Sequence, residues 1–324
     1  MKIAFSVKNN EFWNEGIEKI KSDFPMHDFL MVKENSDEFY DSDLAVAVRM
    51  KSETLEKTSK LKAIFVPFAG INQFPLRDIA EKGIKLSNTH WNAPYVAERA
   101  LTLSLSVLGR VVEFHDKLKQ GVWGGFLAQY EENINWISLR KKKISIIGLG
   151  NIGIELARLL KPFGCDVLGF KRKTDTELPE GVNRITADLN EALEFADVIY
   201  MILPLTKNTR SIINESNKHL LKGKFLINVG RGKTVDEDTL FSLIKDNILK
   251  GAGIDVWYSY PFEKELIHPS KNPIHLLPNI VISPHCASDA YEGEAEGVRK
   301  TLENISIYLN TGEIPDLVDL NEGY

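Results

Sequence analysis

Short strand-like runs alternate with amphipathic segments in the first 88 residues of the chain. Segments predicted to be strands lie at 3–7, 44–48, 63–68 and 85–87, and helical spacing is found at 12–20 and 75–82. Alternation of this kind predicts a parallel sheet with helices on its faces. In such a sheet, the loop that follows the strand ending at Phe68 is a candidate ligand site.

A long helix is predicted from Ala93 to about Lys119, because apolar residues recur there at helical spacing. These residues are Val96, Ala100, Leu103, Val107, Val111 and Phe114. Periodicity alone leaves two interpretations open: an element that crosses between domains and offers an oligomer surface, or a long core helix of one domain. Residues 121–138 are then predicted to form a loop in which Trp123 and Trp136 pack rather than bind a ligand.

The second half of the chain repeats the alternation of strands and helices. Predicted strands lie at 144–147, 166–170, 198–203, 224–229, 251–256 and 280–282, with helical segments at 189–195, 237–246 and after Asn214. A last amphipathic helix, 292–309, is predicted to return to the first domain. The pattern therefore predicts an α/β protein of two Rossmann-like or flavodoxin-like doubly wound parallel-sheet domains.

A glycine-rich turn follows the strand at 144–147 and opens a helix. Gly148, Gly150 and Gly153 match G-x-G-x-x-G, and a second strand follows that helix. The first glycine permits a tight turn, the second lets the backbone approach a pyrophosphate, and the third lets helix and strand pack closely. A plain structural turn is the alternative, but all elements arrive in the order that dinucleotide binding requires. Residues 93–287 are thus predicted to bind a dinucleotide, with 1–92, completed by 288–324, as the substrate-binding domain.

Composition narrows the class of protein. The chain has 40 Lys and Arg against 45 Asp and Glu, without a basic block large enough for nucleic acid. Its two cysteines give no disulfide framework and fit a reducing compartment. The N-terminal apolar run is too short for a signal peptide, and no apolar stretch reaches the roughly 18 residues that span a bilayer. A soluble, cytoplasmic protein without nucleic-acid or membrane partners is expected.

Three polar residues follow strands of the second domain, where open parallel sheets bind ligands. Arg231 lies between two glycines and offers a forked donor for a carboxylate, although a surface arginine in a turn is the alternative. Asp255 ends an apolar strand and needs a hydrogen-bond donor, for which a cofactor amide is one candidate. His285 follows a proline, and its reference pKa of about 6.5 suits acid–base catalysis. A lone histidine is usually structural, but its place in one series with Arg231 and Asp255 favours catalysis; no Cys/His spacing resembles a metal site.

These motifs together resemble the D-isomer-specific 2-hydroxyacid dehydrogenase family over essentially the whole chain. The matches occur in one order: Phe68–Asn72, Asn92 with Val96–Glu98, Gly148–Gly153, Leu203–Thr206 with Thr209, Asn228–Gly232 with Val235 and Asp236, Gly251–Val256, and Ser283–His285.

The resemblance implies hydride transfer between nicotinamide C4 and the 2-carbon of a small oxo or hydroxy acid. Arg231 would hold the carboxylate and polarise the oxo oxygen, and His285 would exchange a proton with that oxygen. Backbone N–H groups of the substrate-binding residues Ala69, Gly70 and Ile71 would hold the carboxylate's other side. The implied cofactor-binding residues are Gly148, Gly150, Asn151, Ile152, Gly153, Leu203, Pro204, Thr209, Val229 and Asp255. The family also implies a homodimer formed through the helix at 93–119.

Tyr260 stands where the family has a glutamate that pairs with the catalytic histidine. A carboxylate raises the pKa of a neighbouring histidine, whereas a neutral tyrosine does not do so by charge. Either His285 works with a lower pKa or another carboxylate supplies the charge. The nearest in sequence are Glu263, Glu265 and Asp289. The hypothesis is an active enzyme with an acid-shifted pH profile for reduction.

Lys171 and Arg172 mark a second departure from the family pattern. An NAD-selective site places Asp or Glu about 20 residues beyond the glycines, on the ribose 2′-hydroxyl. Here Lys171 holds that place and Arg172 follows it. Cations accommodate a 2′-phosphate that an aspartate would repel. We therefore predict NADP(H) as the preferred cofactor with NAD(H) possible, the alternative being a solvated basic turn without selectivity.

Three functions remain open from the sequence. The leading one is an NADP(H)-preferring reductase of small 2-oxo acids such as glyoxylate or hydroxypyruvate. The second is oxidation of 3-phosphoglycerate. The third belongs to another class, a dinucleotide-sensing binding protein like the C-terminal binding protein corepressors. The missing glutamate favours that third function, and the retained Arg231 and His285 oppose it.

Overall fold

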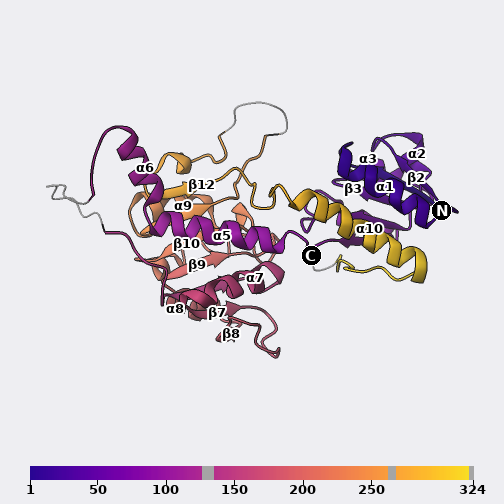
Figure 1. Cartoon of the computed structure of the whole chain (residues 1–324). Coiled ribbons are helices and arrows are strands. Elements are labelled where there is room, and N and C mark those ends of the chain that lie inside the picture. Colours follow the sequence, from indigo (N-terminus) through magenta and orange to yellow (C-terminus); the bar gives the residue numbers. More distant parts are fainter. Residues whose placement is uncertain (126–134, 262–267, 321–324) are drawn as a thin grey trace. The chain divides into compact units, whose positions relative to one another are not determined.

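The computed structural model describes residues 1–125, 135–261 and 268–320, which fall into two compact units (Figure 1). Unit 1 contains residues 1–92 and 289–324, and unit 2 contains residues 93–288. Each unit has a parallel sheet of its own with an apolar core on both faces.

The described part of unit 1 contains a five-stranded parallel sheet in the order β2-β1-β3-β4-β5. Its strands are β1 (Lys2–Ser6), β2 (Asp28–Met31), β3 (Leu44–Ala47), β4 (Ala63–Val66) and β5 (Lys85–Asn88). The register pairs Ala4 of β1 with Leu30 on one side and Ala45 on the other. Every residue of β3 and β4 is buried, as expected for central strands with helices on both faces.

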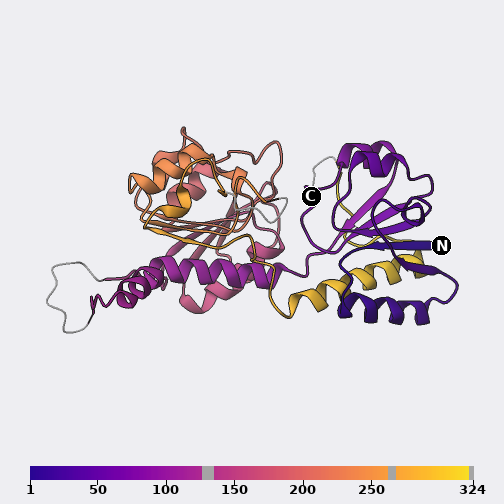
Figure 2. The ribbon, with the colours of Figure 1, turned by 90° about the horizontal axis from the view of Figure 1, so that it is seen from above.

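Helices cover both faces of this sheet. On one face, α1 (Glu11–Asp23) and α10 (Gly293–Thr311) lie side by side, as Figure 2 shows. Gly16 permits this approach, since a Cβ there would lie 2.5 Å from Leu302 Cδ1. The other face is covered by the short helices α2 (Asp37–Tyr40), α3 (Ser52–Glu56) and α4 (Leu76–Glu81).

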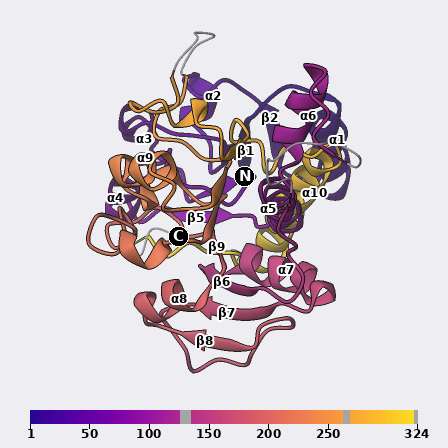
Figure 3. The same cartoon turned by 90° about the vertical axis from the view of Figure 1, so that its left-hand side faces the viewer.

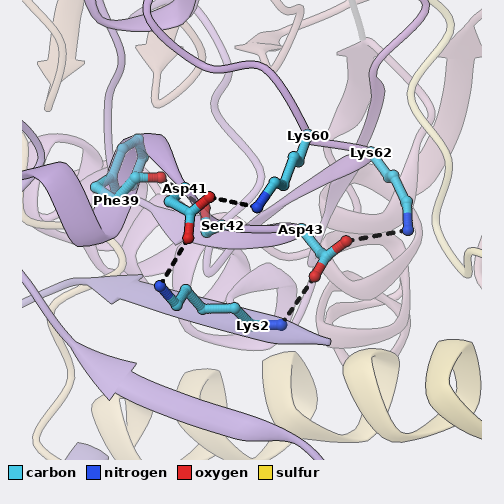
Figure 4. A network of polar contacts seen from close by, with 7 residues as sticks. All are labelled: Lys2, Phe39, Asp41, Ser42, Asp43, Lys60 and Lys62. Carbon is cyan, nitrogen blue, oxygen red and sulfur yellow. Dashed lines mark hydrogen bonds and ion pairs between the residues drawn. The ribbon is translucent and has the colours of Figure 1, made fainter.

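Ion pairs tie together the amino ends of three strands in unit 1 (Figure 4). Asp41 accepts hydrogen bonds from the ammonium groups of Lys60 and Lys2, at 2.5 and 3.0 Å. These bonds lower the pKa of Asp41 to about 2. Asp43 accepts the backbone N–H of Lys2 at 2.9 Å and the Lys62 ammonium at 3.0 Å. Because the pairs are solvent-exposed, they add little to stability and mainly fix how the strands begin.

Over the residues that the structure describes, the sheet of unit 2 has seven parallel strands in the order β12-β11-β10-β9-β6-β7-β8. They are β6 (Lys143–Ile147), β7 (Asp166–Phe170), β8 (Arg184–Thr186), β9 (Val198–Met201), β10 (Phe225–Asn228), β11 (Gly251–Ile254) and β12 (Ile280–Ile282). The strand order reverses beside β6, which pairs with both β7 and β9. Open α/β sheets bind ligands at the carboxyl ends of the strands at such a reversal.

Helices also cover both faces of the second sheet. Figure 3 shows α5 (Ala93–Leu108) and α7 (Asn151–Leu160) on one side, with α8 (Leu189–Phe195) and α9 (Glu237–Lys245) on the other. Glycines in β11 let α5 approach, because a Cβ at Gly253 would lie 3.0 Å from Leu103 Cβ. The remaining helical turns are 3₁₀: η1 (Lys161–Phe163), η2 (Lys218–Leu221), η3 (Gly232–Thr234) and η4 (Ile274–Leu276).

The prediction of one helix over 93–119 is wrong. Helix α5 ends at Leu108, and a separate helix, α6 (Val111–Lys119), follows. Arg110 between them has a left-handed backbone with φ 52°, and its guanidinium donates hydrogen bonds of 2.6 and 2.5 Å to Glu113. Apolar residues continue at helical spacing through the break, so periodicity could not reveal it.

Other expectations about elements also need correction. Strands β2 and β8 were not predicted, because each is a short edge strand that begins with a charged residue. Trp123 and Trp136 are 55% and 60% exposed, so neither belongs to a core, and their packing stays a prediction. Residues 126–134 of the same predicted loop lie outside the described residues. In the parts that the structure describes, no helix is long and apolar enough to cross a membrane.

Tyr200→Phe should lower the free energy of unfolding by about 1 kcal/mol, the typical net value of one buried hydrogen bond. Tyr200 is fully buried on β9 and donates to Ser104 Oγ at 2.7 Å, and Ser104 in turn donates to the carbonyl of Leu101. Urea unfolding followed by circular dichroism measures the loss. Tyr291→Phe makes the same change on a ring that is 90% exposed, and should stay within about 0.5 kcal/mol of the wild type. Equal losses of unfolding free energy in both variants would contradict a stabilising role for the hydrogen bond between Tyr200 and Ser104.

Candidate active site

The glycine-rich turn of unit 2 is fixed by close backbone packing. Gly148 has φ 113°, and a Cβ there would lie 3.0 Å from backbone atoms of Ile202 and Leu203. A Cβ at Gly153 would lie 2.5 Å from the Gly148 carbonyl oxygen, so that glycine lets α7 pack on the turn. Any other residue at position 148 would be both strained and crowded.

Gly150 differs from these two glycines because the space beside it is open. A Cβ at Gly150 would meet no heavy atom of the described residues within 4 Å. Gly150 is the N-cap of α7, a helix of ten residues, so the unpaired N–H groups of the first turn and the positive end of the helix dipole face this space. Open backbone at a helix N-terminus fits the diphosphate of a dinucleotide, so the chain's own residues suit that cofactor.

Lys171 and Arg172 lie beside the glycine turn. The N–H groups of Gly148 and Leu149 both donate to the Phe170 carbonyl, at 3.2 Å, which brings the end of β7 against the turn. The next N–H group, that of Lys171, donates to Thr186 of β8 at 3.0 Å. Both cationic side chains are at least partly exposed. The end of β7, which Lys171 and Arg172 follow, therefore lies against the glycine turn.

The loop after β9 lies on the other side of the glycine turn. Thr209 closes this loop by donating to the Pro204 carbonyl at 2.6 Å and accepting the Thr206 N–H at 2.8 Å. A Cβ at Gly230 would lie 2.8 Å from the Leu203 carbonyl oxygen, so the ends of β9 and β10 also touch. Most of the predicted cofactor residues therefore gather at the carboxyl edge of one sheet, at the ends of β6, β7, β9 and β10.

Arg231 follows β10 in a rigid turn. Its carbonyl accepts hydrogen bonds from Thr234 Oγ1 at 2.7 Å and Asn228 Nδ2 at 3.4 Å, and its Nη1 donates to the Gly230 carbonyl at 2.7 Å. Burial lowers the pKa of the Arg231 guanidinium, and the nearby Tyr260 opposes that change. An arginine stays charged despite such a shift, so Arg231 offers a positioned cation to an anionic ligand.

Asp255 is fully buried at the end of β11 and accepts three hydrogen bonds from the turn after β12. Its donors are Ser283 Oγ at 2.5 Å and the backbone N–H groups of Cys286 and Ala287, both at 3.1 Å. The donors that a buried carboxylate requires are thus supplied by the chain itself. Burial of Asp255 does not depend on a cofactor amide.

His285 lies in that same turn with its side chain exposed and φ at 57°. The Tyr260 ring packs against the imidazole, with 5.2 Å between centroids and 51° between planes. The Tyr260 hydroxyl accepts the Trp257 N–H at 3.0 Å, and Trp257 Nε1 donates to the Ser283 carbonyl at 2.9 Å. Burial raises the pKa of Tyr260, so its phenol is neutral near pH 7. A neutral ring therefore contacts His285 from the position where the family has a glutamate.

Of the three carboxylates that are candidates to replace that glutamate, one lies within the described residues. Glu263 and Glu265 lie outside the described residues, and Asp289 is exposed at the start of the segment that belongs to unit 1. Their participation remains a prediction.

The predicted substrate loop, Ala69–Ile71, belongs to unit 1 and follows β4. The Ala69 carbonyl accepts Asn88 Nδ2 at 2.8 Å, and the Pro67 carbonyl accepts Trp91 Nε1 at 2.7 Å. Asn88, Trp91 and Trp257 were not predicted as supporting residues. Their bonds go to backbone carbonyls, which leave no signature in a sequence.

Comparisons with known proteins decide the family. A model of the D-isomer specific 2-hydroxyacid dehydrogenase NAD binding domain matches residues 101–287. The chain belongs to the D-isomer specific 2-hydroxyacid dehydrogenase family. A glyoxylate reductase of Thermococcus litoralis is 31% identical over 282 residues, covering 83% of this chain and 80% of that protein.

Further relatives and structures agree with this assignment. Glyoxylate/hydroxypyruvate reductase B of Erwinia tasmaniensis is 31% identical over 267 residues, covering 81% of this chain and 80% of that protein. An acyclic imino acid reductase solved with NADPH and D-Arg matches with a TM-score of 0.82 and 25% identity, over 98% of this chain and 100% of that one. The predicted α/β fold with two parallel sheets is confirmed, as is the predicted class, an NAD(P)-dependent oxidoreductase acting on 2-hydroxy acids.

Gly148→Ala and Gly150→Ala should separate folding from cofactor binding. Gly148→Ala should lower the free energy of unfolding by about 2 kcal/mol or more, because it strains the backbone and crowds β9. Gly150→Ala should leave stability within about 1 kcal/mol of the wild type, because its methyl group meets open space. It should nevertheless weaken binding of NADPH and NADH. Urea unfolding and nucleotide fluorescence titration measure the two effects, and unchanged nucleotide binding by Gly150→Ala would contradict the proposed diphosphate position.

Proposed function

We propose that this enzyme reduces small 2-oxo acids, with glyoxylate and hydroxypyruvate as the leading candidates, and prefers NADPH to NADH. The observation that carries the proposal is that Arg231, Asp255 and His285 follow three adjacent strands, β10, β11 and β12. A fixed cation and an exposed imidazole at one sheet edge suit an anionic substrate that must exchange a proton. The glyoxylate reductase relatives support this substrate class.

The proposed roles follow from the chemistry of each group. Arg231 binds the substrate carboxylate and polarises the oxo oxygen, because its guanidinium is a forked donor held by the Gly230 carbonyl. His285, as imidazolium, gives a proton to that oxygen during reduction and removes it during oxidation. When bound, the nicotinamide supplies or takes up the hydride. In unit 1, the N–H groups of Ala69, Gly70 and Ile71 remain predicted donors to a carboxylate.

The cofactor would be held along the edge formed by the glycine turn and the loops after β7 and β9. The proposed contacts are Gly148, Gly150, Asn151, Ile152, Gly153, Leu203, Pro204, Thr209 and Val229, with Asp255 near the nicotinamide end. Lys171 and Arg172 favour NADPH because they can pair with a 2′-phosphate. The imino acid reductase, which has a similar fold and was solved with NADPH, is consistent with this preference.

We also propose a homodimer formed through the region of α6. Large apolar side chains are exposed on and after this helix: Val111, Val112, Leu118, Val122 and Trp123. Such a patch is typical of a protein interface.

Both cysteines are free, which fits a reducing compartment and the proposed cytoplasmic location of the protein.

A panel of 2-oxo acids assayed with NADPH and NADH tests the function. With the best of glyoxylate, hydroxypyruvate, pyruvate and 3-phosphohydroxypyruvate, kcat/KM should be at least about tenfold higher for NADPH than for NADH. A tenfold ratio corresponds to about 1.4 kcal/mol, which one favourable charge pair with the 2′-phosphate would supply. Lys171→Asp should lower kcat/KM for NADPH and spare NADH, whereas Lys250→Asp, at an exposed lysine elsewhere in unit 2, should change neither.

Two results of the panel would count against the proposal. A clear NADH preference of the wild type would remove the cofactor assignment. Absence of turnover with every acid would favour the dinucleotide-sensing alternative.

Tyr260→Glu should extend reduction to higher pH. Reduction needs His285 protonated, so its rate falls as pH rises through the pKa of that imidazole. A carboxylate at position 260 favours the imidazolium and raises that pKa, which should move the fall in kcat upward by about one pH unit. Tyr260→Phe keeps the ring without charge and should retain the wild-type profile. A wild-type profile that moves to lower pH in Glu263→Gln or Glu265→Gln would show that one of those residues already supplies the charge.

A further inference from the structure

The turn that carries His285 is held together by hydrogen bonds to one buried carboxylate. Asp255 accepts Ser283 Oγ on one side of His285 and the N–H groups of Cys286 and Ala287 on the other. The histidine is thus the part of the turn between these anchor points. Its side chain is exposed while Asp255 is fully buried.

The backbone of His285 needs such an anchor. Its φ of 57° lies in the left-handed region, which a residue other than glycine holds only when its surroundings impose it. Two consecutive N–H groups directed at one carboxylate impose that conformation on the residue before them. They therefore fix the direction in which the imidazole leaves the chain.

The carboxylate itself is held on a rigid support. The Asp255 N–H donates to the Asn228 carbonyl of β10 at 3.0 Å, and the Ser283 N–H donates to the Ile254 carbonyl of β11 at 2.9 Å. Trp257 adds a further bond from Nε1 to the Ser283 carbonyl. These bonds fix the position of the turn that carries His285 relative to β10 and β11.

We propose that Asp255 is a positioning residue for His285, which it aims by clamping the 283–287 turn. The proposal rests on the proposed function, in which His285 exchanges the proton with the substrate oxygen. It is separate from the cofactor contact that the family resemblance implies for Asp255. A clamp of this kind acts on the proton-transfer step through His285, whereas the cofactor contact acts on dinucleotide binding.

Asp255→Asn changes the clamp with almost no change of shape. A carboxylate accepts on both oxygens, whereas an amide accepts on one side and donates on the other. If the amide oxygen faces Ala287, the Cys286 N–H meets a donor, and the reverse orientation leaves Ala287 without an acceptor. One of the two backbone anchors is lost in either orientation.

A double-mutant cycle tests whether Asp255 acts through His285. At saturating NADPH, Asp255→Asn should lower kcat for the best 2-oxo acid about tenfold or more. In a His285→Ala background, the same substitution should cost less than about twofold in residual kcat, because no imidazole remains to be aimed. Asp188→Asn, at the N-cap of α8, is the matched control and should leave kcat unchanged. Additive losses would overturn the proposal, because they would show that Asp255 acts independently of His285.

Amide hydrogen exchange tests the clamp without any turnover. In the wild type, the Cys286 and Ala287 amides should be protected, and Asp255→Asn should speed exchange of at least one of them about tenfold while β10 amides stay protected. Unprotected amides in the wild type would overturn the inference even if Asp255→Asn fails to fold. A wild type that protects these amides but reduces no 2-oxo acid would instead sink the proposed function and leave the clamp standing.

Discussion

Close contact between strand ends is the constraint on which the rest of unit 2 depends. The backbone at Ile202 and Leu203, just after β9, lies against Gly148 on one side and Gly230 on the other. Neither glycine could carry a side chain without pushing these strand ends apart. Because the ends converge, loops from distant parts of the sequence meet at one edge. The groups proposed to bind cofactor and substrate are placed by this backbone packing rather than by direct attraction between them.

Charged side chains with internal hydrogen-bond partners then order the loops at that edge. Asp255 and Arg231 each need internal partners: Asp255 has the N–H groups of the turn after β12, and Arg231 has the Gly230 carbonyl of its own turn. Such hydrogen bonds order the turns, because breaking one leaves an unsatisfied group in a region of low dielectric. Trp257 connects the two turns: its carbonyl lies against Gly232, and its indole N–H binds the Ser283 carbonyl. The Arg231 turn and the His285 turn are therefore parts of one rigid arrangement.

Sequence alone predicts those parts of this arrangement that depend on residue type. The glycines at 148, 150 and 153, the helix they open, and the strand at Asp166–Phe170 all lie where the pattern places them. It could not reveal the break at Arg110, because that break is a change of backbone angle inside a continuous apolar pattern. It also could not reveal the Asp255 clamp. Two of its three donors are backbone N–H groups about thirty residues away, and every residue except proline has one.

The return of α10 to unit 1 has a consequence for the order in which the protein folds during synthesis. The core between α1 and the sheet of unit 1 includes Val298 and Ile305, and the Val318 N–H pairs with the Leu86 carbonyl at the edge strand. Unit 1 therefore lacks one of the two helices that cover this face of its sheet until the ribosome has made residues 293–311. In the sequence, unit 2 comes between the two pieces of unit 1, so it can complete its own core first. Part of the apolar face of the N-terminal sheet stays exposed meanwhile, and exposed apolar surface of this kind favours aggregation of nascent unit 1.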